Sequence, residues 1–251
     1  SLGLFKNPVK LNPGKGDRVV VAMSGGVDSS VVAKLLTQAD YDLSAVYMRN
    51  WDTRDESGSD SGCEWKKNYA DVQRVCKALD IPCTMIDLSK EYWNTVFQPS
   101  LHEWEAGGTP NPDIWCNKEI KFGALMKHLS TEDTWVATAS FTKQQVREKA
   151  HEWNLPTAAR EESMGICFVG EKRRFHEFIS QYIPPKPGNI IASGKVVGVH
   201  QGLWQYTIGQ NARIRGMSQK MFVSHKDLLN NEIHVVAGGR VFSSPQCQPK
   251  N

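Results

Sequence analysis

Two cysteines and one aspartate are the side chains of this 251-residue chain whose types and surroundings suit chemistry. Asp113 and Cys116 lie just after a stretch, residues 107–112, with two glycines and two prolines, and Cys167 lies in a second glycine-bracketed segment. This composition forbids a helix and predicts a rigid loop, with a helix beginning near Lys118. A thiol beside a helix N-terminus and a lysine is favoured as the thiolate. Two such thiols indicate sulfur chemistry, although structural loops with inert thiols are the alternative.

A second group of residues predicts an anion site. A short apolar strand leads into the string Ser24, Gly25, Gly26, Val27, Asp28, Ser29 and Ser30. Paired glycines let consecutive N–H groups point at one anion, and a helix opened by Ser29 or Ser30 adds its positive N-terminus. A carboxylate beside phosphate, here Asp28, requires Mg²⁺ between them. The string therefore predicts a site for nucleotide plus metal; the alternative is an ordinary turn in which Asp28 or Ser29 caps the helix.

The order of apolar segments indicates how these residues are positioned. Strand-like and helix-like periodicities alternate through the first half, which is typical of an open parallel sheet covered by helices. Such sheets bind ligands at the carboxyl ends of their strands. Cys76 and Cys83 fall inside these elements and are expected in the core, and a capping box of Thr142 and Gln145 predicts a later helix. The expected strands are residues 19–23, 43–48, 82–87 and 134–138, and the expected helices include 31–36, 69–79 and 120–129.

The second half predicts a smaller, β-rich part. Phe175, Phe178, Ile179 and Tyr182 recur at helical spacing and are expected to pack as a core. Short strands follow at residues 190–192, 195–200, 220–224 and 232–237. The predicted fold class is therefore α/β, a doubly wound parallel-sheet domain followed by a small central module and a partial β-barrel. The predicted domains are residues 1–162, 163–209 and 210–251.

Composition and charge narrow the function classes. Hydrophobic residues make up 40% of the chain without a run long enough to span a membrane, so no membrane partner is expected. Residues 1–110 carry 12 Lys+Arg against 15 Asp+Glu, whereas residues 111–251 carry 18 against 12. A basic second half suits a polyanion, although scattered surface charge is the commoner explanation. The six cysteines form no CxxC pair and no secretory signal is evident, which predicts a reducing compartment, and the seven histidines lack metal-ligand spacing.

Several motifs together resemble a known family. The Ser-Gly-Gly-Val-Asp-Ser-Ser string resembles the pyrophosphate loop (PP-loop) of the ATP pyrophosphatases, which activate a carbonyl-type oxygen by adenylation. The wider set of motifs closely resembles the tRNA-specific 2-thiouridylases across residues 17–239. Met164 and the loop after Trp51 are more similar to the mitochondrial branch than to the bacterial one, so a mitochondrial location is expected, with the bacterial cytoplasm as the alternative. The motifs of that set are residues 108–122, residues 163–170, Asn50-Trp51-Asp52, Glu91-Tyr92-Trp93 and Tyr206-Thr207-Ile208-Gly209-Gln210.

The resemblance implies an ATP- and Mg²⁺-dependent enzyme that 2-thiolates the wobble uridine in the anticodon stem-loop of tRNA. ATP would bind at residues 24–30 and Met48, with Asp28 holding Mg²⁺–pyrophosphate, and O2 of the uridine would be adenylated. Cys167 would receive sulfur as a persulfide from a donor such as a cysteine desulfurase or a sulfur relay protein. The terminal sulfur, directly or as hydrosulfide, would displace AMP from C2. Cys116 would act first as an acid and then as the resolving thiol in a Cys116–Cys167 disulfide.

The resemblance also implies roles for residues around these thiols. Asp113 would orient or protonate groups beside Cys116. An iron–sulfur cluster held by Asp113, Cys116 and Cys167 is the rival arrangement. Basic side chains would contact tRNA phosphates, and the candidates are Lys118, Lys121, Lys172, Arg173, Arg174, Arg213 and Arg215.

The chain departs from the family after its fourth expected strand. Family members carry an Ala-Thr-Gly-His-Tyr-Ala-Arg segment and later a Lys-Asp-Gln segment, whereas here Thr142 follows Thr138 within four residues. Residues are therefore expected to be absent between 138 and 142, and the end from Val241 does not complete the family's last barrel. Two other functions remain open: an ATP-dependent amidotransferase or ligase-type synthetase with incidental thiols, and a non-catalytic tRNA-binding remnant.

Overall fold

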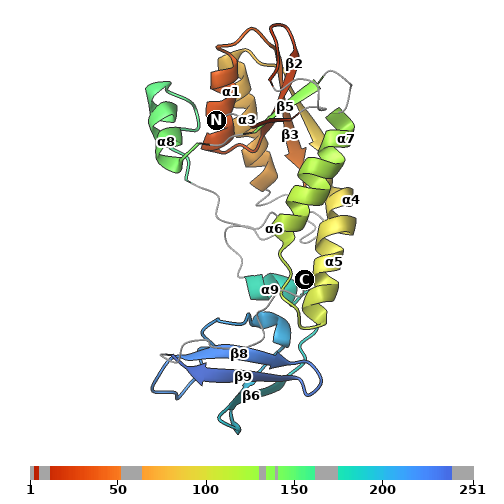
Figure 1. The fold of residues 1–251 in the computed structure, drawn as a ribbon, viewed down its shortest axis with the longest axis vertical. Helices are drawn as coiled ribbons and strands as arrows, with labels where there is room; N and C mark the ends of the chain where they lie inside the picture. The colour runs from red at the N-terminus through yellow and green to blue at the C-terminus, as the bar shows by residue number, and fades with distance from the viewer. Residues whose placement is uncertain are drawn as a thin grey trace. The chain divides into compact units, whose positions relative to one another are not determined.

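The computed structural model describes residues 3–5, 12–51, 64–129, 134–138, 141–161 and 175–238. The chain divides into two compact units (Figure 1). The first unit is Ser1–Val96 with Pro112–Lys172, and the second is Phe97–Asn111 with Arg173–Asn251. No helix among the described residues combines the length and the apolar character that crossing a membrane requires.

A five-stranded sheet in the order β1-β5-β2-β3-β4 forms the centre of the first unit. Strands β2 (Arg18–Met23), β3 (Asp42–Arg49), β4 (Cys83–Asp87) and β5 (Thr134–Thr138) are parallel, and β1 (Gly3–Phe5) runs antiparallel to β5 at the edge. The four predicted strands and the predicted fold class are confirmed, whereas β1 was not predicted. Because β3 and β5 flank β2 on opposite sides, the strand order reverses at β2. The carboxyl end of β2 is therefore the point where such sheets bind ligands.

Two helices pack on one face of this sheet, α1 (Val27–Leu36) and α3 (Glu64–Leu79). Their apolar stripes form one core with buried residues of β2 and β3. Cys76 of α3 is buried in that core, as predicted, whereas Cys83 is only partly buried against it.

Helix α8 (Lys143–Glu152) packs against α1 rather than against the sheet. Val146 and Ala150 of α8 form a small core with Val31 of α1. The predicted capping box is confirmed, since the Thr142 hydroxyl accepts the Gln145 N–H and the Gln145 side chain accepts the Thr142 N–H. The packing against Val31 holds α8 and the turn after it beside α1.

Two helical runs follow β4. The first comprises α4 (Ser89–Tyr92), the π-helix η1 (Trp93–Phe97) and α5 (Gln98–Glu105). The second comprises α6 (Pro112–Trp115), the π-helix η2 (Cys116–Ala124) and α7 (Leu125–Leu129).

The start of the second run corrects the sequence analysis. A rigid loop was expected up to a helix near Lys118, but the helix already begins at Pro112. Proline is tolerated in the first helical position because its missing N–H would have no intrahelical partner there, and its φ suits the helix. Asp113 and Cys116 therefore lie on the helix itself.

The second unit contains a four-stranded sheet in the order β7-β6-β9-β8. Its strands are β6 (Gly188–Ala192), β7 (Lys195–His200), β8 (Met221–Asp227) and β9 (Glu232–Ala237), and β6 and β9 form the parallel pair. All four predicted strands are present, and they span both sides of residue 209, where a boundary was predicted. The core of this sheet is lined by Ile190, Val223 and Ile233.

Helix α9 (Phe175–Ile179) packs against α5 within the second unit. Phe178 and Ile179 are fully buried, and the rings of Phe97 and Phe178 lie 5.8 Å apart. Phe175 lies 5.2 Å from Trp104, and Tyr182 extends the same aromatic group. The predicted core role of these aromatic residues is confirmed.

Candidate active site

The loop of residues 24–30 joins β2 to α1 at the strand-order reversal. Gly25 has φ +81°, a conformation that side chains disfavour, and Gly26 is the N-cap of α1 in an extended conformation. The helix begins at Val27, two residues earlier than Ser29, the first start predicted. The caps predicted in the alternative, Asp28 or Ser29, are also wrong, since the cap is a glycine and no side chain caps the helix. The N-terminus of α1 therefore has no side-chain cap to accept its first N–H groups.

Serine hydroxyls hold the shape of this loop. The Ser24 N–H donates to Ser29 Oγ at 3.2 Å, and the Gly26 N–H lies 3.3 Å from Ser24 Oγ. Ser29 and Ser30 donate to the Gly26 carbonyl at 3.1 and 2.9 Å. Asp28 is exposed in the first turn of α1. The loop therefore combines fixed backbone with one accessible carboxylate.

The end of β3 lies beside the start of this loop. Met23 of β2 pairs in register with Tyr47 of β3, so the next residue, Met48, lies at the carboxyl edge of the sheet. The Tyr47 hydroxyl donates to the Trp65 carbonyl at 3.3 Å, and the Arg49 guanidinium lies 4.8 Å from the Trp65 ring centre. These contacts attach the start of α3 to this edge.

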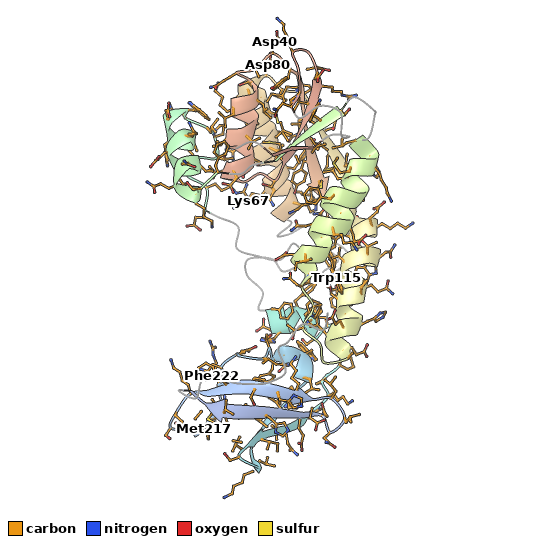
Figure 2. The ribbon with its side chains drawn as sticks, viewed as in Figure 1. Asp40, Lys67, Asp80, Trp115, Met217 and Phe222 are labelled. Atoms are coloured by element: carbon orange, nitrogen blue, oxygen red, sulfur yellow. The ribbon has the colours of Figure 1, made fainter. Side chains whose placement is uncertain are left out.

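Three side chains that the sequence analysis missed surround Gly25; we call Asn68, Asp71 and Arg160 the Arg160 cluster. Arg160, in the turn after α8, donates to the Gly25 carbonyl at 2.8 Å. Its guanidinium also donates to Asn68 Oδ1 and pairs with the Asp71 carboxylate, both on α3. The position of this part of α3 can be found in Figure 2, which labels Lys67, the residue before Asn68. The cluster joins α3, the loop and the turn after α8.

One member of the Arg160 cluster carried a sequence signal. Asp71 follows Asn68 by three positions and precedes Val75 by four, so both polar residues lie on the apolar stripe of α3. A carboxylate on a buried stripe requires a cationic partner, because burying an unpaired charge is costly. Arg160 had no such signal, since a single arginine in a turn is ordinary on a protein surface.

Of the two predicted reactive thiols, Cys116 lies among the described residues and Cys167 does not. Cys116 is the first residue of η2 and is 3% exposed, and Asp113 is exposed three positions earlier. Helical spacing of three makes them neighbours on the helix surface, and π-helical segments often occur at functional sites. Cys167 lies outside the described residues. Its meeting with Cys116 therefore stays a prediction.

A buried lysine holds the segment that precedes Pro112. Lys226 of β8 is 8% exposed, and its Nζ donates to the Gly107 carbonyl at 3.0 Å and lies 3.3 Å from Thr109 Oγ1. Burial lowers the pKa of Lys226. Gly107 has φ +82°, and a Cβ there would meet Leu228 at 2.5 Å. The glycine and the lysine together fix this turn within the second unit, and sequence reasoning had not assigned Lys226.

The predicted basic residues that the structure describes are exposed. Lys118 and Lys121 lie on η2, where Lys118 pairs with Glu119 at 2.9 Å. Arg213 and Arg215 are exposed in the second unit. Residues 172–174, the other three candidates, lie outside the described residues.

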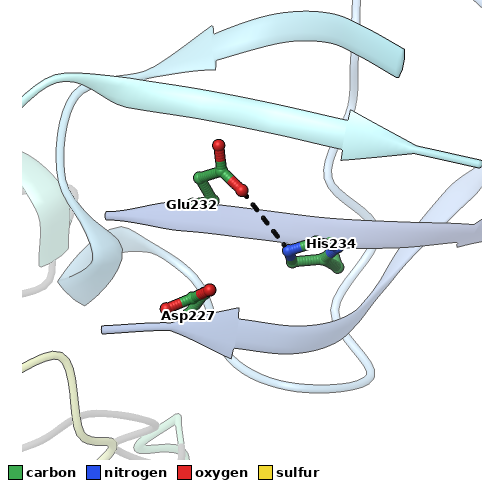
Figure 3. Close-up of side chains that lie close together, drawn as sticks. All are labelled: Asp227, Glu232 and His234. Carbon is green, nitrogen blue, oxygen red and sulfur yellow. Dashed lines mark ion pairs between the residues drawn. The ribbon is translucent and has the colours of Figure 1, made fainter. Parts of the chain in front are cut away.

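A further polar cluster lies at the β8–β9 turn (Figure 3). Asp227, Glu232 and His234 each place a ligand-type atom within 4.8 Å of the others, and His234 Nε2 lies 3.6 Å from Glu232 Oε2. Asp227 accepts N–H groups of Leu229 and Asn230 at 3.0 and 3.1 Å, and hydrogen bonds from Asn230 lower its pKa. The turn itself therefore explains the position of the Asp227 carboxylate.

Family models match both units. The model described as a tRNA methyl transferase HUP domain matches residues 17–141 and 132–171. The model described as a tRNA methyl transferase PRC-barrel domain matches residues 176–237. The first match is divided into two stretches that overlap at residues 132–141, a range that contains β5.

Similar proteins have one name in common, tRNA-specific 2-thiouridylase MnmA. The protein of this name from Bacillus velezensis is 40% identical over 269 aligned positions that cover 88% of this chain and 71% of its own length. The one from Alkaliphilus oremlandii is 38% identical, with 89% and 74% covered. The one from Nitrosomonas eutropha is also 38% identical, with 88% and 74% covered. Such identity over this coverage assigns the family.

Proposed function

This chain belongs to the tRNA-specific 2-thiouridylase family, and we propose that it catalyses ATP-dependent 2-thiolation of the wobble uridine of tRNA. The observation that supports this proposal most directly is the glycine loop after β2, where the strand order reverses. It occurs in a chain that is 40% identical to a protein of that name. The loop supplies a phosphate site and a helix N-terminus, which adenylation by ATP requires. An amidotransferase or ligase-type synthetase would share the loop, but its known relatives would carry other names.

The name of the family models, methyl transferase, suggests another reaction. Methyl transfer from a sulfonium donor involves no triphosphate, so a phosphate loop would have no ligand in that reaction. The loop at Gly25 and Gly26 and the buried thiol of Cys116 are both used when sulfur replaces an oxygen that ATP has activated. Thiolation is therefore the activity that fits the site.

We assign the triphosphate to residues 24–30, with Met48 at the same edge of the sheet. The exposed carboxylate of Asp28 beside the uncapped helix N-terminus suits Mg²⁺, which prefers carboxylate and phosphate oxygens. Bound there, Mg²⁺ would neutralise charge on the pyrophosphate that leaves. The loop amides and α1 orient the chain of phosphates, and O2 of uridine attacks the α-phosphorus with loss of pyrophosphate.

We assign the sulfur steps to the two thiols. The terminal sulfur of a Cys167 persulfide attacks C2 of the adenylated uridine, and AMP leaves with the electrons of the C–O bond. The Cys116 thiolate then attacks Sγ of Cys167, so a Cys116–Cys167 disulfide forms and 2-thiouridine is released. An external thiol reduces the disulfide. Cys116 is 3% exposed, so this attack requires the surroundings of the thiol to open, because a buried thiol is otherwise unreactive.

The rival arrangement for the same residues is an iron–sulfur cluster. Asp113 and Cys116 are helical neighbours and would supply two of its three ligands. In that arrangement the cluster would carry the sulfur for thiolation in place of a persulfide on Cys167. Iron content separates it from the persulfide route.

The partners follow from the same proposal. We propose tRNA as the nucleic-acid partner, a cysteine desulfurase or a sulfur relay protein as the sulfur donor, and the mitochondrion as the location. Exposed basic side chains in both units, at Lys121 and Arg213 for example, support contact with tRNA phosphates.

A second candidate, a tRNA-binding protein without catalysis, is favoured by one observation. The alignment with the Bacillus velezensis protein runs over 269 positions, although this chain has 251 residues, so the relative carries residues that this chain lacks. The HUP match divides at residues 132–141, and the family's Gly-His-Tyr segment is expected directly after β5. We infer that the missing residues belong there and that base recognition depends on them.

Mass spectrometry of the wobble uridine tests these functions directly. Two proteins are incubated with tRNA, ATP, Mg²⁺ and a persulfide source: this chain, and this chain with a family segment inserted between residues 138 and 142. Formation of 2-thiouridine by this chain supports the enzyme, whereas formation by the extended protein alone supports the remnant. Tight tRNA binding without product from either protein would contradict the assigned reaction.

A further inference from the structure

Arg160 is a partly buried cation of the first unit whose guanidinium makes several hydrogen bonds, and no role has been assigned to it above. Its side chain is 19% exposed, and the carboxylate that it pairs with, Asp71, is 7% exposed. Its guanidinium donates to groups of two segments, Gly25 of the loop and Asn68 and Asp71 of α3. Arg160 itself lies in a third segment, the turn after α8. The planar fork of arginine carries five N–H donors in fixed directions and can serve several acceptors at once.

The contact at Gly25 determines how the loop begins. The Arg160 Nη1 holds the Gly25 carbonyl at 2.8 Å, and a peptide group is planar, so the direction of that carbonyl fixes the Gly26 N–H on the opposite side. A Cβ on Gly25 would lie 2.7 Å from the Asn68 carbonyl and 3.2 Å from Arg160 Nη1. The Arg160 cluster therefore contacts the loop at the residue whose unusual φ creates its shape.

The backbone that carries Arg160 is itself fixed. Arg147 of α8 donates to the carbonyls of Ala158 and Arg160 at 3.1 and 2.5 Å. Ala158 packs in the same small core as Val31 of α1. Arg160 is thus presented by a turn that is anchored to the helix that follows the loop.

Asp71 also has a cationic partner outside the cluster. It pairs with Arg160 and with Arg74, which is 64% exposed. Solvent screens the exposed Arg74 pair, whereas Arg160 is partly buried and donates to the Gly25 carbonyl.

We propose that Arg160 is a positioning residue that orients the Gly25 peptide and so prepares the loop for the triphosphate of ATP. The proposal rests on the proposed use of ATP. It assigns Arg160 no contact with the reacting atoms. The Arg160 side chain acts on ATP through the Gly25 carbonyl. Arg160 therefore affects binding of the phosphates and not binding of the adenosine.

Nucleotide binding measured by calorimetry in the absence of tRNA tests the proposal. Arg160→Gln is expected to weaken binding of Mg·ATP about tenfold or more, as loss of one hydrogen bond to a charged donor does, and to leave adenosine binding unchanged. Arg160→Lys keeps the charge but not the fork, so it should lose an intermediate factor. If Arg160→Gln does not fold, Arg160→Lys supplies the same comparison.

Arg74→Gln is the matched control, because Arg74 contacts the same carboxylate but not Gly25. It is expected to bind Mg·ATP within about twofold of the unchanged chain. Equal losses for Arg74→Gln and Arg160→Gln, or a parallel loss of adenosine binding, would overturn the proposal, because general damage to α3 would explain them. Since no tRNA is present, these comparisons decide the inference even if the chain forms no 2-thiouridine.

Discussion

Asp28 is a single exposed carboxylate in the first turn of α1 and contributes little to the core. Asp28→Ala is therefore expected to keep the unfolding temperature of the chain while abolishing conversion of ATP to AMP and pyrophosphate, because the carboxylate organises the metal. Pyrophosphate release in the presence of tRNA, with circular dichroism as the folding control, measures both. Undiminished release from the variant would show that Asp28 has no such role.

The thiols give a second prediction for single residues. Cys167→Ser should form adenylated tRNA without transferring sulfur, whereas Cys116→Ser should stall with an adduct on Cys167. Cys83→Ser is the control, since Cys83 is a partly buried thiol on β4 for which no role is proposed.

Intact-mass spectrometry and iron analysis separate the two arrangements. The persulfide route predicts the trapped adduct and no dependence on iron, whereas the cluster predicts loss of iron from Cys116→Ser, Cys167→Ser and Asp113→Ala alike. Normal thiolation by both serine variants would show that neither thiol takes part.

The loop between β2 and α1 gives a prediction for an element, because its two glycines differ in backbone conformation. Gly25→Ala forces a Cβ to φ +81° and to within 2.7 Å of the Asn68 carbonyl, whereas Gly26→Ala meets only Ser24 Oγ at 3.3 Å. Gly25→Ala should lower the unfolding free energy by about 1–2 kcal/mol or more and weaken ATP binding, and Gly26→Ala should destabilise less. Denaturant unfolding measures the difference. Equal stabilities would mean that the loop relaxes freely.

The sheet of the second unit gives a pH prediction. His200 at the end of β7 is 1% exposed, its Nε2 lies 3.1 Å from the Asn231 carbonyl, and burial lowers its pKa below the usual 6.5. The unfolded chain therefore binds a proton more readily than the folded one between the lowered pKa and 6.5. Stability should fall as the pH drops through this interval, by at most about 1.4 kcal/mol per pH unit for one group.

Thermal unfolding between about pH 7.5 and about pH 5 checks this dependence. His200→Gln should show a shallower loss of stability on acidification than the unchanged chain. Exposed His151 on α8 supplies the control, and His151→Gln should keep the original slope. Identical slopes for all three proteins would show that His200 does not carry the effect.

The charge of the whole molecule is divided unevenly, with 18 Lys+Arg against 12 Asp+Glu in residues 111–251. tRNA affinity should therefore fall steeply with salt, because each phosphate contact releases counterions. Changing both Arg213 and Arg215 to Gln should reduce the slope of log affinity against log salt by about two. Lys15→Gln, in an exposed ion pair with Asp40 on the first unit, should leave that slope unchanged. Affinity independent of salt would contradict an electrostatic interface.

The sequence by itself determined the elements and the class of chemistry. Its apolar periodicities predicted the four parallel strands, and Ser24–Ser30 predicted an anion loop, because these features depend on local spacing. It misplaced element starts, at Val27 and at Pro112, since a glycine N-cap and a proline in the first turn have weak local signals.

Only the tertiary structure decided which distant residues meet. The Arg160 guanidinium contacts Asn68 and Asp71 as well as the Gly25 carbonyl, although 92 positions separate Arg160 from Asn68. Lys226 likewise reaches Gly107 across 119 positions. Such contacts depend on strand order and helix packing, in which a buried polar group takes whichever partner the fold brings to it. Sequence spacing contains no record of that choice.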